Sequence, residues 1–260
     1  MAFVRISLLR EMIFRANFLV RLITHVIWLG LMLVFLKVVF LHTRRIGDWY
    51  KHRLLFFMGT YLTLNATVNC FFMTGCGRFS ELIRTGNLDF ELLKPIDEQF
   101  LLTCQRIDWA LFPQILIGLA ISVIANVQAG VEVGLWRAFS YFALLAGGVA
   151  ILYSLLVMLA AISVWTVRHE ELYELWFCLL QFANYPDEIY RGHFVGAGVR
   201  LVLTYVLPIL LAVIVPAHYG AMLLDDWRPI ASLFAAAFVA LAASRAFFKY
   251  ALRSYQSASS

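Results

Sequence analysis

Long apolar runs constrain this chain more than any other feature of its sequence. Five of them are each close to the length, about 20 residues, that a helix needs to cross the hydrocarbon core of a bilayer. They lie at residues 22–41, 54–74, 109–127, 138–167 and 230–248. The composition agrees, since 62% of the residues are hydrophobic and 14% are charged, whereas a soluble domain has about 45–50% and about 25%. The runs lack the strict alternation of a transmembrane barrel, so we predict an all-α polytopic membrane protein with one domain, residues 1–260.

The number of spans depends on two further apolar segments, residues 172–184 and 199–216. If both cross the membrane, the chain has seven spans and its two ends face opposite sides. Both ends are basic, however, because arginines precede the first run and three basic residues lie within residues 245–253. Basic flanks favour the cytoplasm, so we predict six transmembrane helices, with one of the two segments not crossing completely. The basic loop at residues 42–53 is then outside, which the same rule does not favour.

Irregular helices are expected beside these spans. Pro186, Pro208 and Pro216 interrupt the region at residues 186–216, and broken backbone is tolerated at membrane depth where protein or water covers it. We therefore predict re-entrant helices before the last span. Residues 1–18 are mostly apolar with an arginine at every fifth or sixth position, which is typical of a helix lying at the membrane interface.

The longest hydrophilic stretch between spans is the loop at residues 75–106. A simple connector needs only about 2–8 residues, so the segment is either a docking element for a cytoplasmic partner or a solvated loop. Gly86 is expected to end a short helix at residues 79–85 in the left-handed conformation. Pro95 is expected in the first turn of the next helix, with Asp97 and Glu98 near its positive N-terminal end. The charged side chains around these two hinges are Arg84, Asp89, Lys94 and Glu98.

The same loop resembles a known family. Residues 85–89 read TGNLD, and paired leucines followed by Lys-Pro occupy residues 92–95. This order is similar to the loop after the second span of ABC-2 type exporter permeases, and it looks closest to a small bacterial subfamily. Weaker likenesses lie at residues 185–190, which read YPDEIY, and at residues 255–259. The resemblance covers nearly the whole chain in span order.

Membership of this family implies an export permease in the bacterial cytoplasmic (inner) membrane. The loop would form a coupling helix in a cleft of a separate cytoplasmic ABC ATPase subunit, which would bind ATP and Mg²⁺. The coupling residues would be Arg84, Gly86, Asp89, Lys94, Pro95 and Glu98. The pathway would lie between this chain and a second permease subunit, identical or homologous. The family also has an interfacial helix before the first span and re-entrant helices before the sixth.

The sequence contains no catalytic signature. It lacks GxxxxGK[ST], HExxH and GxSxG, so we expect no enzymatic activity, metal or cofactor in this chain and ATP hydrolysis in a partner. His169-Glu170-Glu171 fits the start of a helix, where carboxylates favour the dipole, better than a metal site. The net charge of +5 is accounted for by span ends near lipid headgroups, so we expect no nucleic-acid partner.

Polar and small residues also lie within the spans. Asn65 and Asn69 share one helical face at i, i+4, and they would either line a polar pathway or bond to a neighbouring helix. Small residues at four-residue spacing in the last span favour close packing within the chain or at a dimer interface. They are Ser232, Ala236, Ala240 and Ser244.

Two other functions compete with the permease. A secondary transporter normally buries an ionisable residue near the membrane midplane, and no run places one there. An integral membrane enzyme that modifies lipids would need converging His, Asp or Glu side chains at the interface, and the sequence does not gather them. We therefore favour the permease subunit of an exporter, whose substrate cannot be read from the chain.

Overall fold

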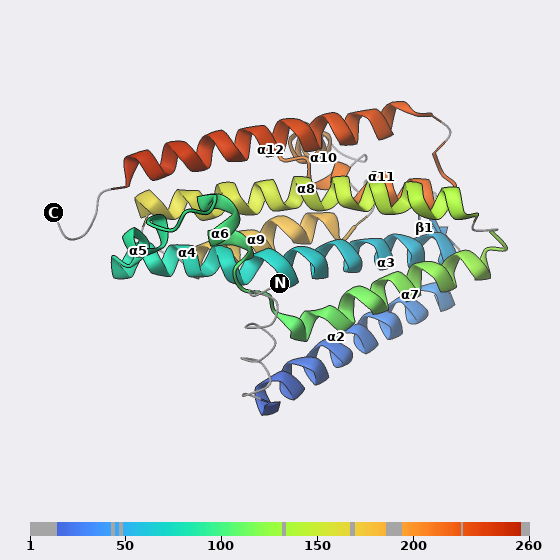
Figure 1. Ribbon diagram of the computed structural model, residues 1–260. Helices are drawn as coiled ribbons and strands as arrows, with labels where there is room; N and C mark the ends of the chain where they lie inside the picture. Colours follow the sequence, from blue (N-terminus) through green and yellow to red (C-terminus); the bar gives the residue numbers. More distant parts are fainter. Residues whose placement is uncertain are drawn as a thin grey trace.

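The computed structural model describes residues 15–42, 45–46, 49–131, 134–166, 170–185, 194–224 and 226–255. It is 86% helical, which confirms the prediction of an all-α membrane protein. The long helices run along a common direction (Figure 1), and the two described strands, β1 (Arg45–Ile46) and β2 (Trp49–Tyr50), form a small antiparallel hairpin at one end. Most of the predicted interfacial helix lies outside the described residues; residues 15–18 form the start of a longer helix.

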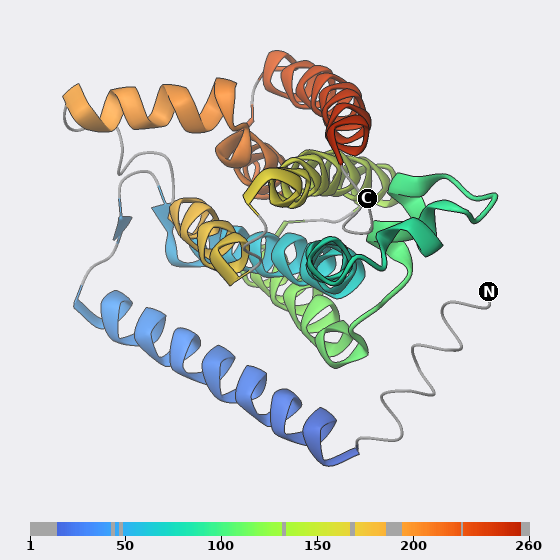
Figure 2. The same ribbon diagram turned by 90° about the vertical axis from the view of Figure 1, so that its left-hand side faces the viewer.

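The helices follow one another with few long connections. In chain order they are α2 (Arg15–His42), α3 (Lys51–Val68), the π-helical turn η1 (Asn69–Met73), α4 (Thr74–Thr85), α5 (Leu88–Leu92), α6 (Glu98–Cys104), the 3-10 turn η2 (Trp109–Leu111), α7 (Phe112–Gln128), α8 (Leu135–Thr166), α9 (Glu170–Ala183), α10 (Phe194–Leu201), the π-helical turn η4 (Val202–Val206), α11 (Ile209–Gly220) and α12 (Arg228–Ser254). Apart from α2, which lies along the outside, the long helices pack as a bundle (Figure 2).

Four of the described helical segments are long and apolar enough to cross a membrane. They are Lys51–Thr85, Trp109–Gln128, Leu135–Thr166 and Arg228–Ser254, which correspond to four of the five predicted runs. The first run falls in α2, where the apolar stretch Ile23–Val34 is shorter than a span. One bent helix pair would make a fifth span, so the count of six stays a prediction.

The second span is longer than expected. A separate short helix was predicted at residues 79–85; these residues are helical and the helix ends before Gly86 as predicted, but they form the end of a much longer helix. The helices α3 and α4 join through η1 into one segment of 35 residues, Lys51–Thr85. A π-helical turn holds one extra residue but keeps the backbone hydrogen bonds running. The helix therefore continues past the apolar run and carries the second span directly into the loop.

A small-residue seam joins α3 to α7. A Cβ atom built on Gly118 would lie 2.5 Å from Thr63 Oγ1, and one on Gly59 would lie 2.5 Å from Ser122 Oγ. Both hydroxyls bond to their own helix, Thr63 to the Gly59 carbonyl at 2.8 Å and Ser122 to the Gly118 carbonyl at 3.1 Å. The two helices thus approach through a small-xxx-small pattern on each side, as membrane helices without large side chains between them do.

The small residues predicted in the last span do not form one surface. The helix α12 packs mainly on α8, and Ala240 and Ser244 belong to its buried side, whereas Ser232 is exposed and Ala236 is half-buried. Ser244 donates to the Leu241 carbonyl within its own helix at 3.0 Å. Half of the stripe therefore serves packing within the chain, and a role of its exposed half at an interface between copies stays a prediction.

The region with the prolines contains a sharp bend. The segment of α10 and η4 meets α11 at 87°, with Leu207 and Pro208 at the break. Proline lacks a backbone N–H and ends the preceding helical pattern. The helix α11 packs against α8 and α3, while α10 points away from the bundle (Figure 2). A broken span and a re-entrant hairpin both fit this geometry, and residues 186–193 of the predicted region lie outside the described residues.

Aromatic contacts account for part of the basic loop at residues 42–53. Trp49 is fully buried, with its ring 5.0 Å from that of His218 and 5.3 Å from that of Phe57. The Arg53 guanidinium lies 5.7 Å from the centre of the Tyr50 ring, a distance at which a cation is attracted to an aromatic face. One of the positive charges in this loop, that of Arg53, thus has a partner within the folded chain.

Candidate functional site

Within the loop at residues 75–106, the chain leaves α4 in a defined turn at Gly86. This glycine has φ 70° and ψ 8°, the left-handed conformation that was predicted for it. The Gly86 N–H donates to the Ile83 carbonyl at 3.2 Å, and the Asn87 N–H donates to the Leu82 carbonyl at 3.0 Å. These bonds satisfy the last carbonyls of α4 and turn the chain into α5.

Charged side chains hold α5 against the second span. One Glu91 oxygen accepts from Arg78 at 3.2 Å, and the other accepts from Lys94 at 2.5 Å. Arg78 also donates to Gln105 Oε1 at 2.6 Å. The side chains of Arg78 and Glu91 are 26% and 11% exposed, so their bond is partly shielded from water and stronger than that of a surface pair, whereas Lys94 is 47% exposed. Lys94 therefore forms an ion pair within the loop and also contributes charge to its surface.

Pro95 does not lie in the first turn of a helix, contrary to prediction. It sits in a tight turn that the Ile96 N–H closes by donating to the Lys94 carbonyl at 2.8 Å. The helix α6 begins later because Asp97 is its N-cap, with Oδ1 accepting from the Phe100 N–H at 3.0 Å. Glu98 follows in the first turn, as predicted, where a carboxylate favours the helix dipole.

An ion pair ties this cap to the last span. Arg245 of α12 donates to both carboxylate oxygens of Asp97, at 2.7 Å for Oδ1, and to Gln99 Oε1 at 3.4 Å. The hydrogen bonds from Arg245, and then the one from the Phe100 backbone, lower the pKa of the Asp97 carboxyl. Gln99 in turn donates to the Tyr153 hydroxyl of α8 at 3.1 Å. The loop is therefore anchored to two spans beyond those that it connects.

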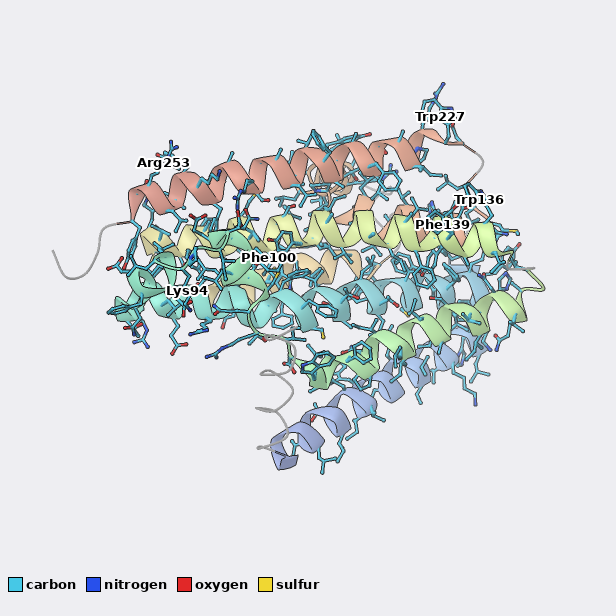
Figure 3. The ribbon with its side chains drawn as sticks, in the orientation of Figure 1. Lys94, Phe100, Trp136, Phe139, Trp227 and Arg253 are labelled. Atoms are coloured by element: carbon cyan, nitrogen blue, oxygen red, sulfur yellow. The ribbon has the colours of Figure 1, made fainter. Side chains whose placement is uncertain are left out.

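The tip of the loop exposes large apolar side chains that were not predicted as functional. Phe90, Leu93 and Ile96 are 69%, 81% and 42% exposed; we call these three residues the tip cluster. Phe100 is also exposed, near Lys94 (Figure 3). Of the predicted coupling residues, Arg84, Lys94 and Pro95 are exposed, whereas Asp89 and Glu98 are half-buried. The sequence signal that could have revealed the tip cluster is the regular spacing of its apolar side chains, one at every third position within a charged loop.

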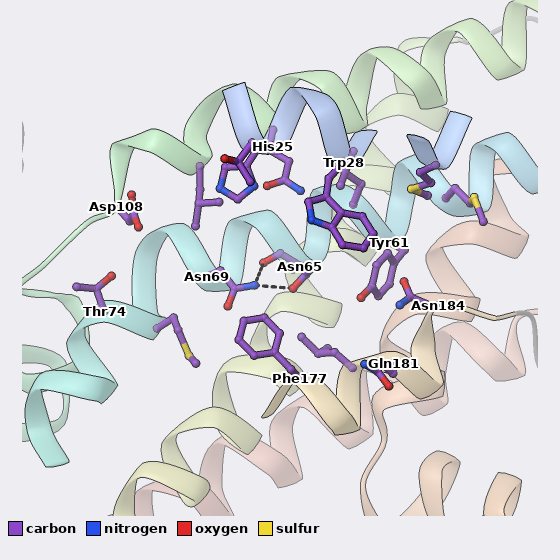
Figure 4. Close-up of a pocket in the computed structure, with 18 of the residues that line it drawn as sticks. His25, Trp28, Tyr61, Asn65, Asn69, Thr74, Asp108, Phe177, Gln181 and Asn184 are labelled. Carbon is purple, nitrogen blue, oxygen red and sulfur yellow. Dashed lines mark hydrogen bonds between the residues drawn. The ribbon is translucent and has the colours of Figure 1, made fainter. Parts of the chain in front are cut away.

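A cavity of about 1160 Å³ lies between α2, α3 with η1, the start of α7 and α9. Figure 4 shows Asn65, Asn69, Tyr61, Gln181 and Asn184 around it. About half of its lining side chains are polar, and they lie beside Trp28, Phe177 and three methionines. The cavity thus places hydrogen-bonding groups between α2 and a bundle of membrane-spanning length.

The predicted asparagine pair lines this cavity and also joins two helices. Asn69 Nδ2 donates to Asn65 Oδ1 at 2.5 Å and to the Asn65 carbonyl at 2.9 Å. Asn69 Oδ1 accepts from Trp176 of α9 at 3.3 Å, so Asn69 bonds across helices. A third polar contact pairs Tyr61 with Asn184, just beyond α9. The bond to Trp176 supports the helix-joining role, and the role of the pair in a polar pathway stays a prediction.

The described residues hold no group of three or more His, Cys, Asp or Glu side chains suited to a metal ion. His169 lies outside them, and α9 starts at Glu170.

Comparison with known proteins identifies one family. The family model described as ABC-2 family transporter protein matches residues 26–259. Neither a curated protein nor a solved structure matches the chain. The matched residues include the loop, most of the cavity lining and every described helix from the middle of α2 onward. Membrane subunits of this family are permeases that generally work with separate ATPase components. This chain therefore belongs to the ABC-2 family and is a multi-pass permease of an ABC transporter.

Proposed function

We propose that this permease is an exporter subunit driven by a separate cytoplasmic ATPase that binds ATP and Mg²⁺ and docks on the loop at residues 75–106. Its membrane would be the bacterial inner membrane, and a second permease subunit, identical or homologous, would complete the pathway. The observation that carries the proposal is the tip cluster, three large apolar side chains held outward on a fixed scaffold.

A solvated connector would not have this structure. The left-handed cap at Gly86, the buried carboxylate of Glu91 and the cap at Asp97 hold the loop in one conformation. Exposed apolar clusters on such a scaffold mark interaction sites, and the surrounding charges favour a specific protein partner over bare lipid. A docking surface therefore explains both the rigidity and the exposure.

The same scaffold supplies a route for motion. The second span continues without a break into α4, so displacement of the loop moves the wall of the cavity formed by α3 and η1. Asp97 and Gln99 extend the connection to α12 and α8. ATP-driven movement of the partner would thus reach several spans at once, with Asn65 and Asn69 on the moving segment.

The ends of the bundle support the orientation. Exposed Trp136, Phe139 and Trp227 lie at the end opposite Lys94 and Arg253 (Figure 3). Aromatic residues gather at membrane interfaces, and basic residues favour the cytoplasm. The aromatic residues mark a membrane interface at the far end, and the basic residues at the loop's end support a cytoplasmic loop, on the side where ATP is available.

Co-purification tests the proposal. Phe90 and Leu93 are exposed, so Phe90→Gln with Leu93→Gln should leave the permease folded and inserted but weaken retention of the ATPase subunit at least about tenfold, because two apolar contacts are lost. Glu81→Gln on the exposed side of α4 is the matched control and should retain the ATPase normally. Stoichiometric ATPase on the double variant, with unchanged stimulation, would refute docking at the tip cluster.

A further inference from the structure

We infer that the cavity binds an uncharged amphiphile whose polar head carries several hydroxyl groups, such as a glycosylated lipid. This rests on the proposed function only in taking the cavity as part of the transport pathway. Binding itself requires no ATPase, so the two proposals can fail separately.

The chemistry of the lining favours a neutral head. Its central polar groups are amides and hydroxyls, from Tyr61, Asn65, Asn69, Gln181 and Asn184. Amides both donate and accept hydrogen bonds, as hydroxyl groups do. A head with many hydroxyls can therefore match them in more than one orientation.

Part of this hydrogen-bonding capacity is unused within the described residues. Asn65 accepts through Oδ1 and its carbonyl, but its Nδ2 makes no bond there. The side chains of Gln114 and Gln181 likewise line the cavity without a bond in the described part of the chain. Polar groups at membrane depth need partners, and a hydroxyl-rich ligand provides them.

The cavity lining provides no net charge for a charged head. Arg106 and Asp108, two residues apart where the chain enters η2, have opposite charges, and Asp108 Oδ1 accepts from the Ala110 N–H at 3.2 Å. His25 adds a ring that can bond as a neutral imidazole. An ionic head would lose its hydration without a net charge of opposite sign to replace it, which is costly at this depth.

The apolar part of the lining fits a hydrocarbon chain. Trp28, Met32 and Met58 form one side and Phe177 and Leu180 another. Methionine and aromatic side chains adapt to irregular aliphatic ligands. The source of the ligand is therefore the membrane, and a free sugar, which lacks the hydrocarbon part, should bind poorly.

The test measures lipid retention by native mass spectrometry on the intact permease released from nanodiscs. The nanodiscs contain equal amounts of three lipids with identical acyl chains: monoglucosyl diacylglycerol, phosphatidylglycerol and a trimethylammonium-propane lipid. We expect the glucosyl lipid to be retained about tenfold more than either charged lipid. Equal or greater retention of a charged lipid would overturn the inference, as would displacement of the glucosyl lipid by free maltose.

Variants locate the binding site. Asn65→Leu with Gln181→Leu removes the unused Asn65 Nδ2 donor and the Gln181 amide. It also removes the Asn65 Oδ1 acceptor, but Asn69 keeps its bonds to the Asn65 carbonyl and to Trp176, so the helices should stay together. We expect the double variant to lose about tenfold or more in affinity for the glucosyl lipid, at about 5-fold for each hydrogen bond. Gln128→Leu, on an exposed amide outside the cavity, is the matched control and should change nothing. Unchanged glucosyl-lipid binding in a folded double variant would show that the cavity is not the site.

Discussion

The contact between Asp97 and Arg245 provides the sharpest test of how the loop is anchored. Asp97 makes two separable interactions, the cap of α6 and the ion pair with α12. Asp97→Ala removes both. Asp97→Asn keeps a capping oxygen but removes the charge, and Arg245→Gln removes the ion pair but leaves the cap.

The expected losses follow from exposure and geometry. An N-cap is worth about 1 kcal/mol. The ion pair is 42% exposed at Asp97 and 36% at Arg245, so it falls in the range of surface pairs, about 0.2–1 kcal/mol, with its two-pronged geometry favouring the upper end. We therefore expect losses of about 1.5–2 kcal/mol for Asp97→Ala and about 0.5–1 kcal/mol for each of the other two variants.

Hydrogen exchange of the α6 amides in nanodiscs measures these losses as local opening. The opening constant should rise about 10- to 30-fold in Asp97→Ala and about 2- to 5-fold in Asp97→Asn and in Arg245→Gln. Combining the last two substitutions should add little, because they remove the same interaction. Arg253→Gln, an exposed change on the same helix, is the control. Additive losses in the Asp97→Asn, Arg245→Gln pair, or no loss in Arg245→Gln, would refute the assignment.

The same contact makes α6 sensitive to acid. Arg245 and the Phe100 backbone lower the pKa of Asp97 in the folded protein. A carboxyl with a lowered folded pKa stabilises the fold above its ordinary value, about 3.9, and this contribution is lost as the pH falls through the folded pKa. Opening of α6 should therefore be steady from about pH 8 to 5 and increase below about pH 4. Asp97→Asn should lack that increase; an identical acid response in this variant would assign it to other carboxylates.

Two further predictions concern glycines. Gly118→Ala should lower the unfolding temperature in detergent, with a loss of about 1–3 kcal/mol in the free energy of unfolding, because the new Cβ would lie 2.8 Å from the Thr63 backbone nitrogen. The control Gly30→Ala should be neutral or stabilising, because a Cβ there has nothing within 4 Å. Equal effects of the two substitutions would contradict the close approach of α3 and α7. The Gly86→Val variant should insert normally yet lose retention of the ATPase subunit, since a β-branched residue is strained at φ 70° by at least about 1–2 kcal/mol. The control Gly86→Asn should behave like the parent chain. Normal retention with valine would argue against a role for this turn.

Features set by nearby residues were predictable from the sequence. Four of the five apolar runs became helical segments long and apolar enough to cross a membrane, the left-handed conformation followed from Gly86, and Glu98 lies in the first turn of α6. Each of these depends on hydropathy or on backbone preferences within a few residues. Pro95 shows the limit of such reasoning, because the side chain of Asp97 competed for the helix start and determined where α6 begins.

Features set by distant residues were not predictable. Nothing local links Asp97 to Arg245, which lies 148 residues further along the chain. Small residues occur in several spans, and only their packing shows that Gly59 and Gly118 form a close helix contact while Ser232 does not. Asn65 and Asn69 were recognised as a polar pair that lines the cavity, but the position of α9 decides which of them bonds to Trp176.

The π-helical turn η1 also bears on how relatives of this chain should be compared. Such a turn contains one residue more than an α-helical turn, so a homologue without it would align with a single-residue gap somewhere within residues 69–73. Each residue of an α-helix turns the chain by about 100°. Loss of that one residue would therefore rotate α4 by roughly a quarter of a circle relative to α3, and would carry the loop and its tip cluster to a different face. Subfamilies that differ by this gap should consequently be unable to exchange their ATPase partners, even where the loop sequences are the same.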